Sequence, residues 1–258
     1  MSDDVFTCTS IAGIAMPITN TQSGTNVHEI AEGIYRINTP VVLPGDGPDF
    51  SFNQYLIDDD EPLLFHTGLR GLFPLVLEAV SSVMPVERLR HVAFSHFEAD
   101  ECGALNQWLA AAPQSAPLCG TVAAMVSVAD YADRAPRALA DGESVTLGRH
   151  TVRWMDAPHL PHGWETGFLM EEHTGTLLCG DLFTQPGRGE VALTDGDILG
   201  PSEAFRHAMD YFSHSKHAGA LLEKLAQTNP GTLAVMHGSA WRGDGAGLLR
   251  ALAGELAR

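Results

Sequence analysis

The chain has 258 residues, 45% of them apolar, and carries a formal net charge of −17 at pH 7 from 32 acidic and 15 basic side chains. This length is enough for one domain with a sizeable core. The scarcity of Lys and Arg excludes nucleic acid and anionic membrane surfaces as partners, and no apolar run approaches the roughly 18 residues of a membrane span.

Residues 1–27 mix Ser, Thr, Asn and Gly without a clear period, which predicts an arm or an edge strand ahead of a single domain over 28–258. The first ten residues, MSDDVFTCTS, are acidic and contain no basic region followed by an apolar one, so we expect a cytoplasmic protein. None of the four cysteines belongs to a CxxC pair, and a thiolate metal site is therefore not expected.

The first half of the domain is predicted to begin with a strand meander and to continue with helices. Short apolar segments closed by Asp, Gly or Pro predict strands over 32–38, 50–58 and 62–68. The spacing of apolar residues predicts a helix over 72–84, a buried strand over 90–96 and a helix over 104–112. The loop after the buried strand then lies at a carboxyl end, where open α/β sheets bind their ligands.

The second half repeats this mixture of strands and helices. Paired apolar segments predict two hairpins, over 144–157 and 166–181, and a further strand over 232–238. Helices are expected over 217–228 and 245–258. Two halves with strands first and helices after predict an α/β protein in which two β-sheets pack together with helices outside.

The segment HFEADECG, residues 96–103, gathers one histidine and three carboxylates directly after the buried strand. Anionic groups this close repel one another unless a positive charge lies among them. In an extended segment His96, Glu98 and Asp100 would face the same way, and imidazole with carboxylates suits zinc, manganese and ferrous iron. A helix N-terminus that attracts carboxylates would explain Asp100 and Glu101, but not His96 and Glu98.

The motif His96-Phe97-Glu98-Ala99-Asp100, followed by Gly103, resembles the metallo-β-lactamase superfamily and, within it, the branch of flavodiiron and oxygen-binding diiron proteins. Hydrolases of the superfamily usually carry histidine at the position of Glu98. The resemblance covers about residues 28–258 and implies an αββα sandwich of two mixed β-sheets. It also implies two iron ions as the cofactor, with zinc or manganese as the alternative. A carboxylate in place of an imidazole agrees with iron, since it makes the site harder and stabilises oxidised metal.

The same resemblance assigns ligands in three later segments. In APHLPHGWETGF, His162 fits the family pattern because Thr166 follows it four residues later, whereas His159 does not fit. Asp181, at the end of GTLLCGD, corresponds to the carboxylate that bridges two metals, and His237 in LAVMHG corresponds to the last histidine. The four carboxylates of this set would balance two divalent ions, because the imidazoles are neutral.

Glu101 departs from the family pattern, in which histidine usually follows the Asp of the motif. One outcome is that Glu101 takes the same coordination position through a single carboxylate oxygen. The other is that Glu101 points away and His159 or water fills the place. Either outcome changes the affinity and the potential of the second metal, and loss of that metal would leave a mononuclear site.

Aromatic residues close to the motifs are candidates for an apolar wall that keeps water away from the metals. They are Phe97, Trp164, Phe183 and Trp241, and Tyr211 is a candidate hydrogen-bond donor to a bound ligand. The alternative is that these aromatics are ordinary core residues.

The first functional hypothesis is an iron protein that binds or senses dioxygen. Flavodiiron proteins reduce dioxygen or nitric oxide with electrons from a flavodoxin-like domain, and no Gly-rich FMN loop is found up to Arg258. Reduction would therefore need a separate electron donor, and sensing would need a signalling partner. The alternatives are a Zn- or Mn-dependent hydrolase and a signalling or scaffold protein with a structural metal. Because members of the superfamily often form dimers, we expect a homodimer.

Overall fold

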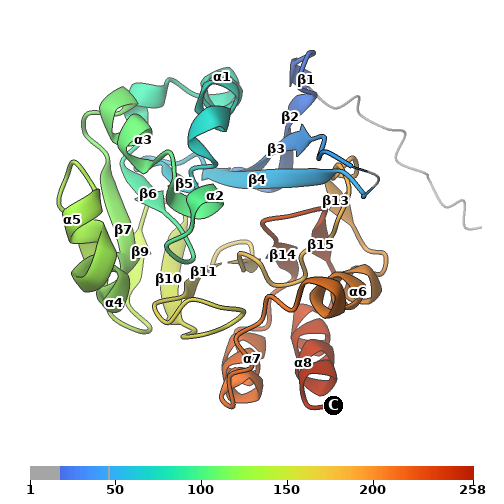
Figure 1. The fold of residues 1–258 in the computed structure, drawn as a ribbon. Coiled ribbons are helices and arrows are strands. Elements are labelled where there is room, and N and C mark those ends of the chain that lie inside the picture. Colours follow the sequence, from blue (N-terminus) through green and yellow to red (C-terminus); the bar gives the residue numbers. More distant parts are fainter. Residues whose placement is uncertain (1–17, 46) are drawn as a thin grey trace, which may run out of the picture.

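The computed structural model describes residues 18–45 and 47–258, and residues 1–17 of the expected arm lie outside this part. Two β-sheets lie face to face, and helices cover their outer surfaces (Figure 1). The α/β sandwich predicted from the sequence is confirmed. Of the segment 18–27, Ile18–Asn20 forms the edge strand β1 and the last residues begin the next strand.

The first sheet follows the chain from one edge to the other, in the order β1 to β8. The strands from β1 to β5 pair antiparallel, as a meander does, and those from β5 to β8 pair parallel. After β1, its strands are β2 (Thr25–Ala31), β3 (Ile34–Val41), β4 (Phe50–Ile57), β5 (Leu63–Phe65), β6 (His91–Ala93), β7 (Ala116–Gly120) and β8 (Arg137–Leu139).

The second sheet has the order β13-β15-β14-β12-β11-β10-β9. Its pairs are antiparallel except β12 with β14 and β13 with β15, so this sheet is also mixed. Its strands are β9 (Ser144–Thr146), β10 (Thr151–Asp156), β11 (Gly167–Glu171), β12 (Thr176–Leu178), β13 (Leu193–Thr194), β14 (Thr232–Ala234) and β15 (Ala240–Arg242).

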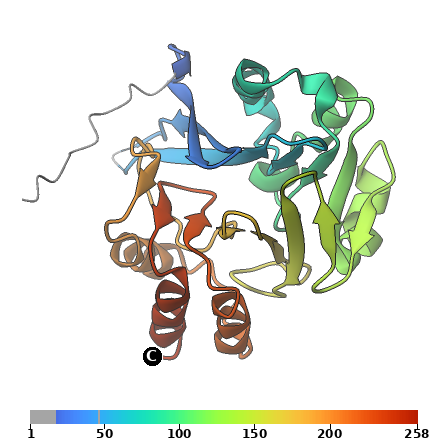
Figure 2. The same ribbon diagram turned by 180° about the vertical axis from the view of Figure 1, so that it is seen from behind.

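Helices lie on the outer face of each sheet, as the view from behind also shows (Figure 2). Those that follow the first sheet are η1 (Arg70–Leu72), α1 (Phe73–Val83), η2 (Val86–Arg88), α2 (Ala99–Cys102), α3 (Leu105–Ala111), α4 (Thr121–Ala123), the π-helical η3 (Ala124–Val128) and α5 (Ala129–Tyr131). Those that follow the second sheet are α6 (Leu199–Met209), α7 (Ala218–Ala226) and α8 (Gly245–Leu256). None of the described helices is long and apolar enough to cross a membrane.

Three apolar clusters hold these layers together. One lies between the first sheet and its helices, one between the two sheets, and one between the second sheet and α7 and α8. Strand β11 shows why the strands fit this arrangement: Phe168 and Met170 pack in the outer cluster, whereas Leu169 between them packs in the cluster between the sheets. Alternation along a strand sends neighbouring side chains to opposite faces, so a strand buried on both sides is apolar throughout.

Several elements depart from the sequence-based expectation. The strands β7, β8, β13 and β15, the helix α6 and the helical stretch 121–131 were not predicted. The extended segment expected from His96 to Asp100 ends at Glu98, because the helix α2 begins at Ala99. Asp100 and Glu101 therefore lie in the first turn of a helix, where carboxylates are favourable.

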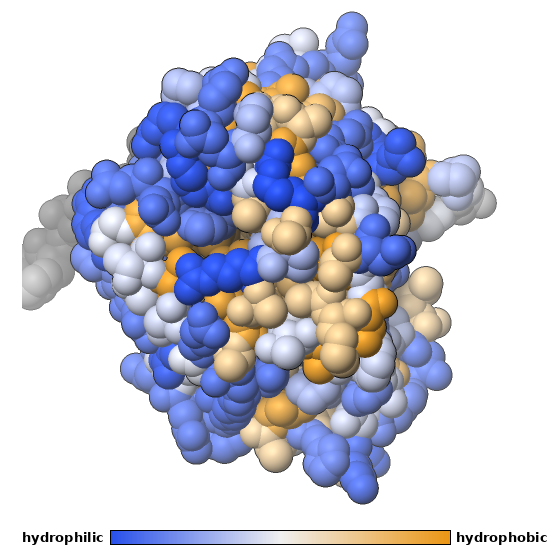
Figure 3. All heavy atoms as spheres, turned by 90° about the vertical axis from the view of Figure 1, so that its left-hand side faces the viewer, coloured by the Kyte–Doolittle hydropathy of each residue, from blue (hydrophilic) through white to orange (hydrophobic). Residues whose placement is uncertain are grey.

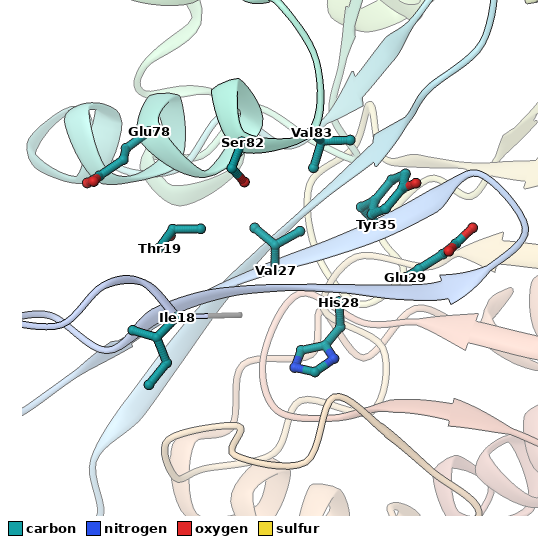
Figure 4. Close-up of a pocket in the computed structure, with 9 residues that line it drawn as sticks. All are labelled: Ile18, Thr19, Val27, His28, Glu29, Tyr35, Glu78, Ser82 and Val83. Carbon is teal, nitrogen blue, oxygen red and sulfur yellow. The ribbon is translucent and has the colours of Figure 1, made fainter. Parts of the chain in front are cut away.

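Two surface features of the fold lie outside the segments that carry the metal-site motifs. The face with α4 and α5 exposes apolar side chains among hydrophilic ones (Figure 3). Met125 and Val126 of η3, between these two helices in the chain, are exposed. A groove of about 840 Å³ runs between α1 and the first strands, with Val27 and Tyr35 on its strand side and Glu78 on its helix side (Figure 4).

Candidate metal centre

Seven side chains with metal-binding atoms converge at the carboxyl ends of strands from both sheets. The loop and helix after β6 carry His96, Glu98, Asp100 and Glu101, and the segments after β10, β12 and β14 carry His162, Asp181 and His237. All seven were proposed from the sequence. Because parallel strands such as β12 and β14 end at the same sheet edge, the residues that follow them meet there.

The first donor group contains His96, Glu98, His162 and Asp181. The Nε2 atoms of His162 and His96 lie 2.9 and 3.1 Å from Oε2 of Glu98. The same two nitrogens lie 3.4 and 3.6 Å from Oδ2 of Asp181. These atoms are close enough to share one metal ion, with two imidazoles and two carboxylates as donors.

The second donor group contains Asp100, Glu101 and His237. Nε2 of His237 lies 3.4 Å from Oδ2 of Asp100 and 3.3 Å from Oδ1 of Asp181. Asp181 therefore faces the first group with one oxygen and the second group with the other. A carboxylate in this position can bridge two metal ions.

Each histidine of the two groups directs Nε2 toward the centre because its Nδ1 is engaged elsewhere. Nδ1 of His162 donates to the carbonyl oxygen of Tyr211 at 3.1 Å, and that of His237 donates to the carbonyl oxygen of Ser51 at 2.8 Å. Nδ1 of His96 lies 2.9 Å from the hydroxyl of Ser95. Such partners fix the ring orientation and the tautomer of metal-binding histidines.

His237 follows a strand of the second sheet but is held by residues of the first. Besides the Ser51 carbonyl, the side chain of Asn53 donates to the carbonyls of Val235 and Gly238 at 2.9 and 2.8 Å. The buried guanidinium of Arg36 donates to the same Gly238 carbonyl at 2.8 Å. These contacts join the sheets beside the centre and anchor the segment that carries His237.

Glu165 links the two loops that carry the first donor group. Its Oε1 accepts a hydrogen bond of 2.9 Å from the backbone N–H of Phe97, next to Glu98. Glu165 itself lies in the loop of His162 and is 92% buried, since its exposed fraction is 8%. No sequence motif marks Glu165, because a carboxylate that binds a backbone N–H has no characteristic pattern.

The surroundings of the centre shift the pKa values of its carboxylates and histidines in different directions. Hydrogen bonds from His162 and His96 lower the pKa of Glu98 to about 2. Burial opposes protonation of His237, but the adjacent carboxylates of Asp100 and Asp181 outweigh this effect and raise the pKa of His237 to about 9. Burial, together with the charges of Asp181 and Asp100, raises the pKa of Glu101 well above its usual value. The site thus concentrates negative charge that it can hold only with protons or cations.

The buried oxygens of the centre fit a metal cofactor. Glu101 is fully buried, and neither of its carboxylate oxygens has a hydrogen-bond partner. Oδ1 of Asp181 is also buried without a hydrogen-bond partner. An unpartnered buried carboxylate is costly, and a bound cation removes that cost. The donor set of imidazoles and carboxylates suits iron, manganese and zinc.

A small cavity of about 140 Å³ adjoins both donor groups. Its apolar wall consists of Phe50, Phe205, Met209 and Tyr211, and its polar wall contains Glu98, Asp100, His162, Asp181 and His237. The ring of Phe50 lies 4.4 Å from that of His237, centroid to centroid. The hydroxyl of Tyr211 donates to the backbone carbonyl of Asp181 at 3.2 Å.

The aromatic wall differs from the one expected from the sequence. Trp164 is exposed, Phe183 is buried in the outer core, and the indole of Trp241 donates to the carbonyl of Gly196. Phe97 packs against Tyr131 beside an apolar pocket that includes Glu98 but not the other metal-binding residues. Phe205 belongs to the unpredicted helix α6, so no sequence signal pointed to it.

His159 is not brought to the centre. It is exposed, has a φ of 63°, and lines a different pocket with Arg206 and Lys216. The side chain of Glu101 turns inward and lies beside Asp100 and His237, whereas His159 does not. This geometry favours the outcome in which Glu101 takes the coordination position, and that outcome stays a prediction.

The chain is similar to known proteins in both sequence and fold. The model of a family described as ODP family beta lactamase matches residues 50–238. The rubredoxin-oxygen oxidoreductase of Megalodesulfovibrio gigas is 26% identical over 139 residues, which cover 52% of this chain and 34% of that protein. The chain thus matches about a third of the length of this relative.

Solved structures share the fold. The rubredoxin oxygen:oxidoreductase of Desulfovibrio gigas superimposes with a TM-score of 0.75 at 19% identity, covering 88% of this chain and 61% of that one. The flavodiiron protein of Giardia intestinalis gives a TM-score of 0.70 at 19% identity, covering 90% of this chain and 59% of that one. The arrangement of two mixed sheets is therefore shared with parts of longer proteins.

Proposed function

This chain belongs to the family described as ODP family beta lactamase, and from that premise we propose that it is a non-haem diiron protein that binds or senses dioxygen. The observation that carries the proposal is the pair of donor groups that share Asp181 beside a small apolar-walled cavity. The names of its relatives, a rubredoxin-oxygen oxidoreductase and a flavodiiron protein, support the same chemistry.

Iron held by the two groups would supply electrons and open coordination positions to a diatomic ligand. The chain itself supplies orientation, since the Nδ1 partners of the three histidines keep each Nε2 directed at the centre. The four carboxylates offset the charge of the cations and favour the oxidised state of iron. Phe50 and Phe205 limit the access of water on one side of the cavity.

The cavity beside the donor groups, of about 140 Å³, has room for a diatomic ligand next to the metal-binding atoms. A hydrolase of the same superfamily would need a binding surface for its substrate beside the metals. Glu98 in place of the usual histidine also favours iron over zinc.

Given an external electron donor, we propose that the same site reduces dioxygen or nitric oxide with protons from solvent. The donor would be a separate redox protein or a domain that accompanies this one. The homodimer and the cytoplasmic location expected from the sequence stay predictions.

The test starts from protein expressed in iron-supplemented medium and purified without oxygen. Elemental analysis by mass spectrometry should give about two irons per chain, and an optical titration should show a spectral change with dioxygen. As a control, the exposed Trp164→Phe variant should behave like the wild type, because the indole lies outside the cavity. Zinc or manganese alone, or a spectrum that dioxygen leaves unchanged, would overturn the proposal in favour of a hydrolase.

A further inference from the structure

The two donor groups differ in the kind of atom they offer. The group at Oδ2 of Asp181 contributes two imidazole nitrogens, from His96 and His162, and one further carboxylate, Glu98. The group at Oδ1 of Asp181 contributes one imidazole, from His237, and two further carboxylates. We call these the imidazole-rich half-site and the oxygen-rich half-site.

Glu101 causes this difference, and its side chain has no alternative place. Its carboxylate is fully buried, and both oxygens lack a hydrogen-bond partner. Its backbone carbonyl accepts a hydrogen bond of 2.7 Å from the N–H of Thr67. This bond holds α2 against the segment that follows β5. The unpartnered oxygens of Glu101 therefore group with Asp100 and His237 in the oxygen-rich half-site, and Oε2 also lies 3.9 Å from Nε2 of His96.

Neither His159 nor His66 lies where it could give the oxygen-rich half-site a second nitrogen donor. His159 is exposed in a different pocket, and His66 is buried behind Ser95, whose hydroxyl lies 3.1 Å from its Nε2. Within the described residues, no other histidine belongs to either metal-binding group. The oxygen-rich half-site thus has a single nitrogen donor.

We propose that the two half-sites select different metals: the imidazole-rich half-site retains iron, and the oxygen-rich half-site exchanges its iron for a harder divalent cation of the manganese type. This inference rests on the proposed dinuclear function. Imidazole favours iron over manganese, whereas carboxylate oxygens suit manganese. Because the oxygen-rich half-site has one imidazole fewer, its preference for iron over manganese is weaker than that of the imidazole-rich half-site.

The experiment is a competition on the whole chain. Protein loaded anaerobically with ferrous iron is equilibrated with rising manganese, desalted, and analysed for both metals by mass spectrometry and for Mn(II) by electron paramagnetic resonance. In the wild type, the first iron should leave at a manganese-to-iron ratio about tenfold lower than the ratio at which the second iron leaves. A changed ligand environment alters metal affinity by about this factor. The curve therefore has two steps.

Two variants at the same position test the cause. Glu101→His supplies a second imidazole and should merge the two steps at the higher ratio, whereas Glu101→Asp keeps the carboxylate and should keep two steps. Circular dichroism of the metal-free variants reports whether each one folds. If Glu101→His does not fold, the two-step curve of the wild type still decides the matter.

Two results would overturn the inference. One is a wild type that loses both irons in a single step, and the other is a folded Glu101→His variant with the curve of the wild type. Either result leaves the diiron proposal standing, because iron still occupies both half-sites at the start. A protein that retains no iron before manganese is added would instead overturn the proposed function.

Discussion

The two carboxylate oxygens of Asp181 face different half-sites, so a change at this residue affects both half-sites. Asp181→Asn keeps the size of the side chain but replaces one metal-facing oxygen with an N–H₂ group and removes the charge. We expect the iron content to fall by about tenfold or more, since even indirect ligand changes cost that much affinity. Elemental analysis after desalting measures it.

The exposed Asp195→Asn variant is the control for Asp181→Asn, because it makes the same chemical change in a residue outside the donor groups. Its iron content should equal that of the wild type. Retention of about two irons by Asp181→Asn would contradict the bridging role.

His66 makes folding sensitive to acid. Burial lowers its pKa from 6.5 to about 3, and its φ of 66° is left-handed. Between pH 6.5 and about pH 3, His66 binds a proton in the unfolded chain but not in the folded chain. The stability that neutral His66 contributes is therefore fully present above pH 6.5 and is lost as the pH falls below it. From pH 6.5 to about pH 4 the loss amounts to about 3 kcal/mol.

The variant His66→Asn tests this linkage, because asparagine tolerates a left-handed φ and does not titrate. Urea unfolding of metal-free wild type and variant at about pH 7 and pH 4 gives the free energies of unfolding. We expect the wild type to lose about 3 kcal/mol more than the variant between these two pH values. An equal loss in both proteins would show that His66 does not cause the acid sensitivity.

At the scale of elements, Glu165 ties the turn after β6 to the loop between β10 and β11. Glu165→Ala removes the acceptor of the partly buried Phe97 N–H, whereas Glu165→Gln keeps an oxygen acceptor. Loss of a hydrogen bond to a charged group costs about 1.5–3 kcal/mol, so we expect Glu165→Ala to lower the free energy of unfolding by about that much.

Loss of this hydrogen bond should also weaken iron binding in Glu165→Ala, because the bond links the two loops that carry Glu98 and His162. Glu165→Gln should retain most of the iron and most of the stability. Equal iron contents in the two variants, measured by elemental analysis, would show that the bridge does not position the ligands.

The elements that could be predicted are those whose packing leaves a periodic pattern. The helices 72–84 and 217–228 and the strand 50–58 were expected close to where α1, α7 and β4 lie. Strands of two or three residues, such as β13 and β15, are too short to show alternation. The segment from His96 to Asp100 was expected to be extended throughout, but a helix begins at Ala99, and this turn sends Asp100 to the second half-site.

At the scale of the whole molecule, the centre joins the two sheets, because the segment after β6 belongs to the first and those after β10, β12 and β14 to the second. Without metal, four carboxylates repel one another across this junction. A metal at about 100 times its dissociation constant adds about 2.7 kcal/mol of stability. For a chain of this size, that raises the melting temperature by about 5–10 °C.

This linkage is measured by thermal unfolding of the protein with metal, after a chelator, and after reloading with iron. The melting temperature should fall on chelation and recover on reloading. As a control, the chelator should leave the melting temperature of metal-free Asp181→Asn unchanged. A wild type with the same melting temperature in all three states would show that metal binding is not coupled to folding.

The sequence by itself determined the fold class and the residues that meet at the centre, because alternating and helical patterns fix the layers and the ligands follow strand ends. It also marked Glu101 as the departure from the family pattern. Only the tertiary structure decided which half-site each ligand joins, that Glu101 turns inward while His159 stays outside, and that Phe50 and Phe205 line the cavity. The physical reason is that these facts depend on contacts between segments far apart in the chain, which local periodicity does not encode.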